Sequence, residues 1–386
     1  MRRLGLIWLL ACPLAADVVG DGWDHFYNLE YDAAVECFRE AIATARDNPL
    51  YHNYLAQAVL YQELYRLGAL ESELLTGNDH FTRHEKLRPD PAVTAGFLGA
   101  IDRAIELAGA RLQTHPRDQD ALYALGAAYG LRTNYRFLVQ KSWRAAAGDG
   151  SAARKYHNQV VELNPRHYDA LLTQGAYDYI IGSLPWHVRL FSYLVGKSGD
   201  KQRGIRTVEL VAQKGDRNRV DAQVLLAIVY RREKQPEKAV RALEPLIRAY
   251  PRNYLFRLEK GHMLSDLGRK EESLATLREV EQLALSGRPE YSHIPLEKVY
   301  YEIGNVQFWY NDLAEALENM RRVTRSAKLD LHTGVLAWMR TGQILDLTQR
   351  RSEALEAYRQ AIRFAPQTAA AEESRRYLSS PYRRKG

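Results

Sequence analysis

Residues 122–129 read LYALGAAY, a stretch in which Gly126 lies among large apolar residues at helical spacing. A small residue recurs at the equivalent place of five later segments, at Gly175, Ala227, Gly261, Gly304 and Gly342. A small side chain lets two helices approach closely, and large residues three or four positions away fill the space between them. The recurrence therefore predicts a series of packed antiparallel helix pairs.

A second pattern marks the other helix of each predicted pair. A small residue is followed four positions later by a large one at Ala239–Leu243, Ala316–Met320 and Ala354–Tyr358. Pro251 and Pro366 come after the first and the last of these segments, and proline ends a helix. Since one helix pair cannot bury its apolar face alone, neighbouring pairs are expected to stack.

Together the two patterns resemble the tetratricopeptide repeat, a helix pair of 34 residues with an L-G-x-x-Y first helix and an A-x-x-x-F second helix. The interval from Ala227 to Gly261 equals that period. The resemblance implies an all-α fold, a right-handed solenoid of about eight helix pairs over residues 17–366. Residues 367–386 are expected to form a capping helix and a basic tail. Length alone, 386 residues, would instead suggest two or three domains.

Residues 1–16 have the layout of a secretory signal peptide, with a basic start, an apolar run and small residues before Asp17. The apolar run is shorter than the roughly 18 residues that span a bilayer. We therefore expect an exported protein, periplasmic or associated with the cell envelope. Residues 9–12 also resemble a bacterial lipobox, so lipidation of Cys12 is an alternative. A buried N-terminal helix is another.

Composition excludes several classes of protein. The apolar fraction is 46%, the charged fraction 26% and the formal net charge +7, which argues against wholesale disorder and a polytopic membrane protein. Two cysteines exclude a disulfide framework. Five basic residues lie in the two terminal segments, at Arg2, Arg3 and residues 383–385, so the charge does not argue for a nucleic-acid partner. The 24 tyrosines are assigned mainly to helix-packing and groove positions of the repeats.

Three repeats carry extra chain between their helices, near residues 68–94, 132–148 and 180–200. Insertions at the same point of successive repeats emerge on one edge of a solenoid. They hold an aromatic and apolar set, Tyr135, Phe137, Trp143, Trp186, Leu190 and Phe191. These side chains are expected to pack on one another, or to form an apolar pocket or partner surface. Contact of residues 184–195 with a membrane interface is a further alternative.

No catalytic or metal-binding pattern is complete. Gly196–Ser198 resembles the end of a phosphate loop, but Phe191 stands where the loop requires glycine. His80 and His84 are four residues apart without the H-E-x-x-H order of a zinc protease. The sequence therefore predicts a non-enzymatic protein with no metal site and no cofactor.

Two smaller features have structural interpretations. Asp120, Asp169 and Asp221 each lie at the start of a predicted first helix, where an aspartate caps the helix or interacts with its dipole. Cys37 lies on a predicted packed helix and is interpreted as a small core residue.

The resemblance also implies a function, because tetratricopeptide proteins usually bind proteins or peptides in a concave groove lined by first helices. The family's exposed first-helix positions correspond to Tyr123, Tyr179, Arg231, Arg232, His262, Tyr301, Asn305 and Phe308. This set suits a polar peptide or an anionic group held by the two arginines. A chaperone-type carboxylate clamp is not expected, since Tyr301 stands where that clamp has a cation. The alternative function is an exported small-molecule or lipid binder whose apolar pocket is formed by the insertions.

Overall fold

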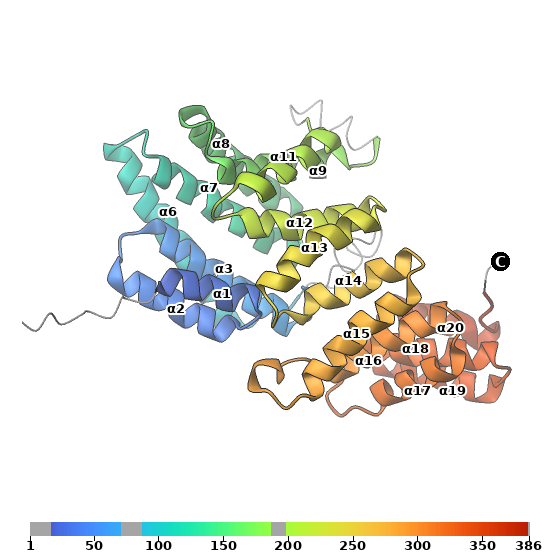
Figure 1. Ribbon diagram of the computed structural model, residues 1–386. Coiled ribbons are helices and arrows are strands. Elements are labelled where there is room, and N and C mark those ends of the chain that lie inside the picture. Colours follow the sequence, from blue (N-terminus) through green and yellow to red (C-terminus); the bar gives the residue numbers. More distant parts are fainter. Residues whose placement is uncertain (1–16, 71–86, 187–197, 385–386) are drawn as a thin grey trace, which may run out of the picture. The chain divides into compact units, whose positions relative to one another are not determined.

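The computed structural model describes residues 17–70, 87–186 and 198–384 (Figure 1). These residues form 17 α-helices and no β-strand, which confirms the predicted all-α fold. Backbone contacts divide the chain into two compact units. Unit 1 comprises residues 1–65 and 88–163, and unit 2 comprises residues 66–87 and 164–386.

Unit 1 is built from six helices: α1 (Val18–Tyr27), α2 (Tyr31–Thr44), α3 (Pro49–Arg66), α6 (Pro91–Thr114), α7 (Gln119–Asn134) and α8 (Trp143–Leu163). The pairs α1–α2 and α7–α8 pack closely, and α6 packs on α7. Proline occupies the first helical position of α3 and α6, where its fixed φ suits a helix start.

Aromatic side chains join α3 to the first helix pair. Trp23 of α1 lies 5.0 Å from Tyr54 of α3, and Phe26 lies 5.2 Å from Tyr61, measured between ring centroids. Tyr31 of α2 contacts Tyr65 in the same way at 5.7 Å. Edge-to-face and tilted ring pairs of this kind stabilise a core beyond simple area burial. The tyrosines of this region therefore serve helix packing, as predicted.

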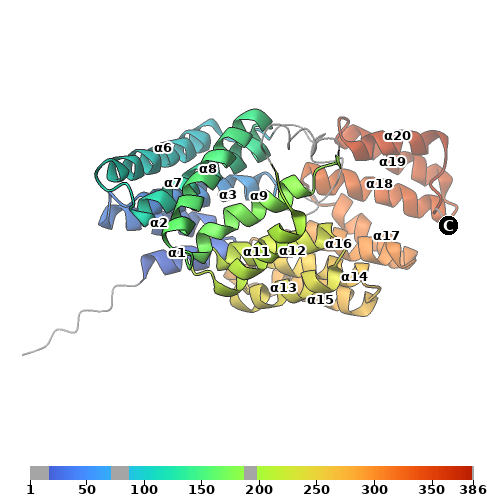
Figure 2. The same cartoon turned by 90° about the horizontal axis from the view of Figure 1, so that it is seen from above.

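Unit 2 contains the other eleven helices (Figure 2). They are α9 (Leu171–Gly182), α11 (Lys201–Lys214), α12 (Arg219–Arg232), α13 (Pro236–Ala249), α14 (Tyr254–Asp266), α15 (Lys270–Leu285), α16 (Leu296–Trp309), α17 (Leu313–Thr324), α18 (Leu331–Leu347), α19 (Arg351–Phe364) and α20 (Ala369–Ser379). Successive helices pack pairwise, α9 with α11, then α12 with α13, and so on to α18 with α19. This pairwise order confirms the predicted repeat architecture.

The small residue of each first helix faces the second helix of its own pair. A Cβ added to Gly304 would lie 2.9 Å from the Met320 side chain, and one added to Gly342 would lie 2.5 Å from the Tyr358 ring. Real Cβ atoms do not approach other atoms this closely, so a side chain at either position would force its neighbour to move. The buried Tyr358 ring has less freedom to move than the end of the Met320 side chain. Met320 and Tyr358 are the large residues of the second pattern seen in the sequence.

The crossing of α9 and α11 is the tightest of these contacts. A Cβ on Gly204 would lie 2.4 Å from the Tyr179 backbone nitrogen, so here helix backbones meet directly. Arg203 donates two hydrogen bonds to the fully buried carboxylate of Asp178, at 2.7 and 2.9 Å. This ion pair therefore holds α9 to α11 near the two helix ends that flank the insertion near residues 180–200.

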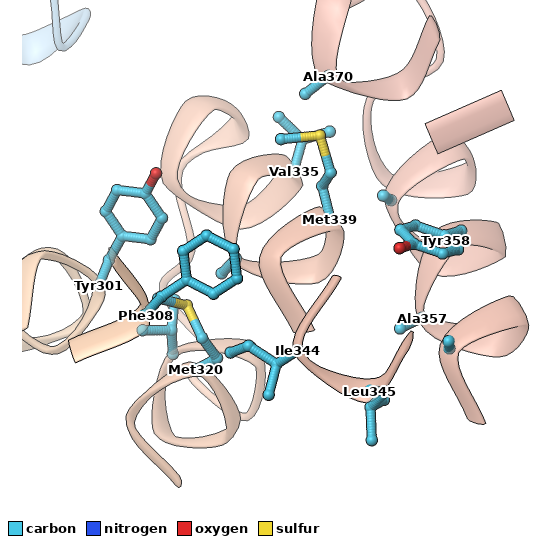
Figure 3. Close-up of a cluster of buried hydrophobic side chains, with 14 of the residues drawn as sticks. Tyr301, Phe308, Met320, Val335, Met339, Ile344, Leu345, Ala357, Tyr358 and Ala370 are labelled. Carbon is cyan, nitrogen blue, oxygen red and sulfur yellow. The ribbon is translucent and has the colours of Figure 1, made fainter. Parts of the chain in front are cut away.

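The C-terminal core of unit 2 is a continuous apolar cluster (Figure 3). Phe308 of α16, Met320 of α17 and Tyr358 of α19 are fully buried in it. Ala370 and Ala371 of α20 complete the cluster where α20 packs on α18 and α19. Helix α20 is thus the capping helix that the sequence predicts.

The predicted insertion near residues 132–148 lengthens a helix pair. Helix α7 continues to Asn134, a π-helical turn covers Tyr135–Val139, and α8 begins at Trp143. Arg132 and Arg136 both pair with the buried carboxylate of Asp149 on α8, at 2.9 and 2.6 Å. The extra residues therefore belong to the two helices that they connect.

None of the three aspartates is the N-cap of its predicted helix, although Asp120 and Asp221 lie in a first turn, where an acidic side chain interacts favourably with the helix dipole. Helix α7 is capped by Asp118, whose Oδ1 accepts the Ala121 N–H at 3.0 Å, and Asp120 lies inside the first turn. Asp169 lies in a short 3₁₀ turn ahead of α9, and its Oδ1 accepts the N–H groups of Asp216 and Asn218. It therefore connects one helix pair to the start of the next. Asp221 does lie in the first turn of α12.

Candidate functional site

The candidate site lies on the first helices of unit 2, α9, α12, α14, α16 and α18. The backbones of α14 and α16 contact each other directly, as do those of α16 and α18. Polar and aromatic side chains connect each of these helices to the next. We call this set the first-helix row: Tyr179, Arg231, Arg232, Glu259, His262, Glu302, Phe308 and Arg340.

Arg231 connects α12 to α14. Its Nη1 lies 2.6 Å from Oε2 of Glu259, and the two side chains are only 15% and 12% exposed. A charge-assisted hydrogen bond with so little solvent around it holds both side chains in one geometry. Glu259 is thereby fixed as the acceptor at the centre of the row.

His262 continues the row from α14 to α16. Its Nε2 lies 2.5 Å from Oε2 of Glu302, and its Nδ1 lies 3.8 Å from Oε2 of Glu259. The imidazole therefore stands between carboxylates on its own helix and on the next one. Arg231, Glu259, His262 and Glu302 form one connected polar line across three successive first helices.

At the α9 end, Tyr179 donates its hydroxyl hydrogen to Glu233 at 3.1 Å, and Lys201 reaches the other carboxylate oxygen at 2.6 Å. Burial, together with the neighbouring Glu233 carboxylate, raises the pKa of Tyr179 to about 12. The exposed Arg232 guanidinium lies 6.0 Å from the Tyr179 ring centroid. Its positive charge favours the phenolate and so partly opposes the rise in the pKa of Tyr179. This end of the row therefore presents an exposed cation over an aromatic ring.

At the other end, cations surround Phe308 of α16. The Arg340 guanidinium of α18 lies 4.1 Å from the Phe308 ring centroid and 5.0 Å from that of Trp309. Arg384, from the segment after α20, lies 5.2 Å from the same Phe308 ring. Trp309 itself is 55% exposed. The row therefore ends, as it begins, in aromatic rings with arginine beside them.

The predicted exposure of the groove residues is wrong for half of them. Tyr123, Tyr179, Tyr301 and Phe308 are each at most 7% exposed. The rings are covered by local packing: Tyr123 stacks on His157 at 5.1 Å, and Phe308 lies beneath two guanidinium groups. Tyr123 belongs to unit 1, whereas the other seven residues belong to unit 2.

The other predicted groove residues keep some exposure. Arg231, His262 and Asn305 are half-buried, and Arg232 is exposed. The structure brings Arg231 and His262 together through Glu259, a residue that the sequence reasoning missed. A partner-binding role for the eight residues stays a prediction.

The missed residues had a periodic signal. Glu259, Glu302 and Arg340 each stand two positions before the small residue of their repeat, Gly261, Gly304 or Gly342. A charged residue at one fixed place in three successive repeats points to a shared position on successive helices. Aligning the charged residues with the recurring glycines would have identified these three members of the row.

The aromatic set of the insertions is only partly described by the structure. Tyr135 is buried 5.0 Å from the Phe97 ring, and Phe137 meets Trp143 edge-to-face at 4.7 Å. Trp143 is 48% exposed and Trp186 is 72% exposed. Leu190 and Phe191 lie outside the described residues, as do His80 and His84. Within residues 132–148 the described rings therefore pack on neighbouring rings of unit 1. Packing of the insertions on one another stays a prediction.

The described part of the chain holds no candidate for a metal site or a membrane-spanning helix. No group of three or more His, Cys, Asp or Glu side chains over residues 17–70, 87–186 and 198–384 is placed to hold a metal ion. Among the same residues, no helix combines the length and the apolar character needed to cross a membrane. Burial raises the pKa of the half-buried Cys37 thiol, as do Asp21 and Glu40, so the thiolate is disfavoured.

A family model described as tetratricopeptide repeat matches residues 224–285 and 301–369. No curated protein matches the sequence.

Similar solved structures include yeast Tom70, at 11% identity and a TM-score of 0.42, covering 94% of this chain and 88% of that one. Human IFIT1, solved as a dimer with m7Gppp-AAAA, shows 12% identity and a TM-score of 0.44, with coverage of 95% and 81%. A tetratricopeptide repeat protein from Parabacteroides merdae shows 14% identity and a TM-score of 0.32, with coverage of 83% and 96%. The row from Arg231 to Arg340 lies within the two segments that match the tetratricopeptide repeat model.

Proposed function

We propose that this chain is a non-enzymatic scaffold that binds a protein or peptide along the first-helix row. Tetratricopeptide repeat proteins are usually non-enzymatic and generally bind proteins or peptides. The observation that carries the proposal for this chain is the connected line from Arg231 through Glu259 and His262 to Glu302. It fixes charged groups on consecutive first helices within the matched repeats.

The chemistry of the row favours a polar, extended partner segment. Side chains that hold each other in place lose little conformational freedom when a partner binds, which lowers the cost of association. The exposed Arg232 and the 55% exposed Trp309 stand near the two ends of the row, and arginine and tryptophan are enriched among residues that dominate binding energy. We therefore assign the first partner contacts to these two side chains.

The aromatic insertions are proposed as a second contact. Trp186 is 72% exposed at the start of the segment near residues 184–195. Tryptophan is enriched at protein–protein interfaces relative to the rest of the protein surface. The ring contacts between Phe137 and Trp143 favour this scaffold function over the alternative of an apolar ligand pocket in that insertion.

A capture experiment tests the proposal. Residues 17–386, which exclude the proposed signal peptide, are immobilised as wild type and as the double variant Arg232→Glu/Trp309→Ala, and partners from an envelope extract are quantified by mass spectrometry. We expect a protein recovered by the wild type to fall at least about tenfold with the double variant, since both changes remove binding-prone side chains. Arg278→Glu, an exposed change on the second helix α15, is the matched control and is expected to retain the partner.

Equal recovery by all three proteins would reject the row as the binding surface. A separate variant, Trp186→Ser with Leu190→Ser and Phe191→Ser, tests the insertion. Unchanged recovery with that variant would reject the second contact and leave the row unaffected.

A further inference from the structure

The segment after α20 lies against the Phe308 end of the first-helix row. Ser380 has extended backbone angles, with φ −132° and ψ 119°, and the chain continues through residues 381–384 without helix. The Tyr382 N–H donates to Oδ2 of Asp346 on α18 at 2.8 Å. The Tyr382 ring centroid lies 6.0 Å from that of Phe308. The tail therefore binds to the row in the way an extended peptide would.

Arg384 makes the other contact of the tail. It donates a hydrogen bond to the Phe308 carbonyl, and its guanidinium lies 5.2 Å from the Phe308 ring centroid. Phe308 is in the last turn of α16, where the helix dipole places partial negative charge. The face of an aromatic ring and a carbonyl at a helix C-terminus both favour a cation. Arg383, between these two contact residues, is exposed.

The contacts of the tail can be lost without leaving a buried charge. Asp346 is fully buried, but it also accepts hydrogen bonds from Arg351 at 2.9 Å and from the Tyr358 hydroxyl at 2.9 Å. Its charge therefore stays compensated when the Tyr382 N–H leaves. The Arg340 guanidinium also lies on the Phe308 ring, and neither Arg340 nor Arg384 forms an ion pair with any residue in the described ranges. The positive charges of Arg340 and Arg384 repel each other at the Phe308 ring, which weakens binding of the tail.

We propose that the surface formed by Phe308 and Asp346 is a peptide-binding site that the chain's own tail occupies. It takes an extended segment with an aromatic residue followed two positions later by an arginine, as in Tyr382–Arg384. The tail is therefore an autoinhibitory strap, and a partner segment of the same chemistry binds by displacing it. This inference rests on the proposed function, since it names the part of the row that must be uncovered before a partner binds there.

A synthetic peptide of residues 379–386 is the probe. We expect it to bind a chain ending at Ser380, measured by fluorescence anisotropy, and to bind the full chain at least about tenfold more weakly, because the tail competes in cis. Peptides with Tyr382→Ala or Arg384→Ala should lose at least about tenfold in affinity for the shortened chain, as expected for anchor residues. The Arg383→Ala peptide removes the same charge at the exposed position and should bind like the parent.

Three results would overturn the inference. They are no binding to the shortened chain, equal binding to the shortened and full chains, and an Arg383→Ala loss as large as that of Arg384→Ala, which would indicate general charge attraction. If the shortened chain fails to fold, full-length Tyr382→Ala/Arg384→Ala takes its place, because its tail stays attached without its anchors. Loss of peptide binding with intact, Arg232-dependent partner capture would reject the strap alone, so the two proposals fail separately.

Discussion

At the scale of single residues, the His157 ring that packs against Gly126 explains why glycine stands at this position. A Cβ at this position would lie 2.1 and 2.3 Å from atoms of the His157 imidazole. That ring is 4% exposed, lies within hydrogen-bond distance of the Tyr123 carbonyl at 3.2 Å and stacks on the Tyr123 ring. It therefore has no open space to move into.

We predict that Gly126→Ala destabilises the protein by about 1–3 kcal/mol, since overpacking a filled core costs about that much. Gly99→Ala on α6 is the matched control, because nothing lies within 4 Å of its added Cβ. This control should gain about 0.5–1 kcal/mol from the better helix propensity of alanine. Thermal unfolding followed by circular dichroism compares the two variants. A Gly126→Ala protein as stable as wild type would contradict the role of the close crossing.

Residues of this kind could be predicted from the sequence because their cause is local and repeated. A glycine that permits a helix crossing returns at each repeat, with its large partner on the following helix. Exposure could not be predicted in the same way. Phe308 stands at a position that is open in the family resemblance, yet Arg340 and the distant Arg384 cover its ring. A residue 76 positions away leaves no signal at Phe308 itself.

At the scale of an element, the start of α7 depends on Asp118. Burial disfavours its charged form, but the Ala121 N–H and the Arg111 guanidinium outweigh this effect and lower the pKa of Asp118 below its ordinary value. A carboxylate with a lowered pKa stabilises the folded state above its unfolded pKa of about 3.9. That contribution is lost as the pH falls through the lower, folded value.

We predict that Asp118→Ala costs about 1 kcal/mol at pH 7 through loss of the cap. Asp118→Asn keeps an acceptor for the Ala121 N–H and loses only the pairing with Arg111, which is 42% exposed, so it should cost less than about 1 kcal/mol. Hydrogen exchange of the α7 amides measures both effects. The wild type and Asp118→Asn should converge as the pH falls below 4. A difference that persists unchanged at pH 2 would mean that the charge of Asp118 is not the cause.

Helix boundaries at the insertions were harder to predict than the repeats themselves. The sequence indicated only that extra residues near 132–148 lie between the two helices of a repeat. The structure extends α7 and starts α8 early because Asp149 pairs with Arg132 and Arg136 across the two helices. Asp149 follows Arg136 by 13 positions and Arg132 by 17, beyond the spacing at which side chains on one helix meet. Their pairing therefore requires the tertiary structure.

At the scale of the whole molecule, periodicity predicted the helix-pair fold but not its division into two compact units. The resemblance treated residues 17–366 as one array, whereas backbone contacts separate residues 88–163 from residues 164–386. Each unit contains complete helix pairs, so the local pattern is the same on both sides of the division. A repeat pattern reflects contacts between neighbouring helix pairs. It therefore gives no signal at the boundary between two compact units.

The remaining prediction at this scale is export, and the start of α1 gives this prediction a specific cleavage site. Asp17 caps α1, and its Oδ1 accepts the Gly20 N–H at 3.1 Å. Cleavage after Ala16 would retain this cap as the first mature residue. The Asp17 carboxylate would also offset the new terminal ammonium group, which the helix dipole disfavours at this end. We therefore predict that the full chain, expressed in a bacterial host with two membranes, is recovered from the periplasm with Asp17 at its N-terminus.

Intact-mass spectrometry of the periplasmic and membrane fractions measures the site of processing. Leu9→Arg interrupts the apolar run of the leader and should leave an unprocessed chain in the cytoplasm. Cys12→Ser separates the two forms of export, since a lipoprotein would lose its membrane-bound, lipid-modified mass whereas a chain cleaved after Ala16 would be unchanged. An unprocessed wild-type chain in the cytoplasm would instead support a retained N-terminal helix. In that case an envelope extract would be the wrong source of partners for the first-helix row, and the capture experiment would have to use cytoplasmic proteins.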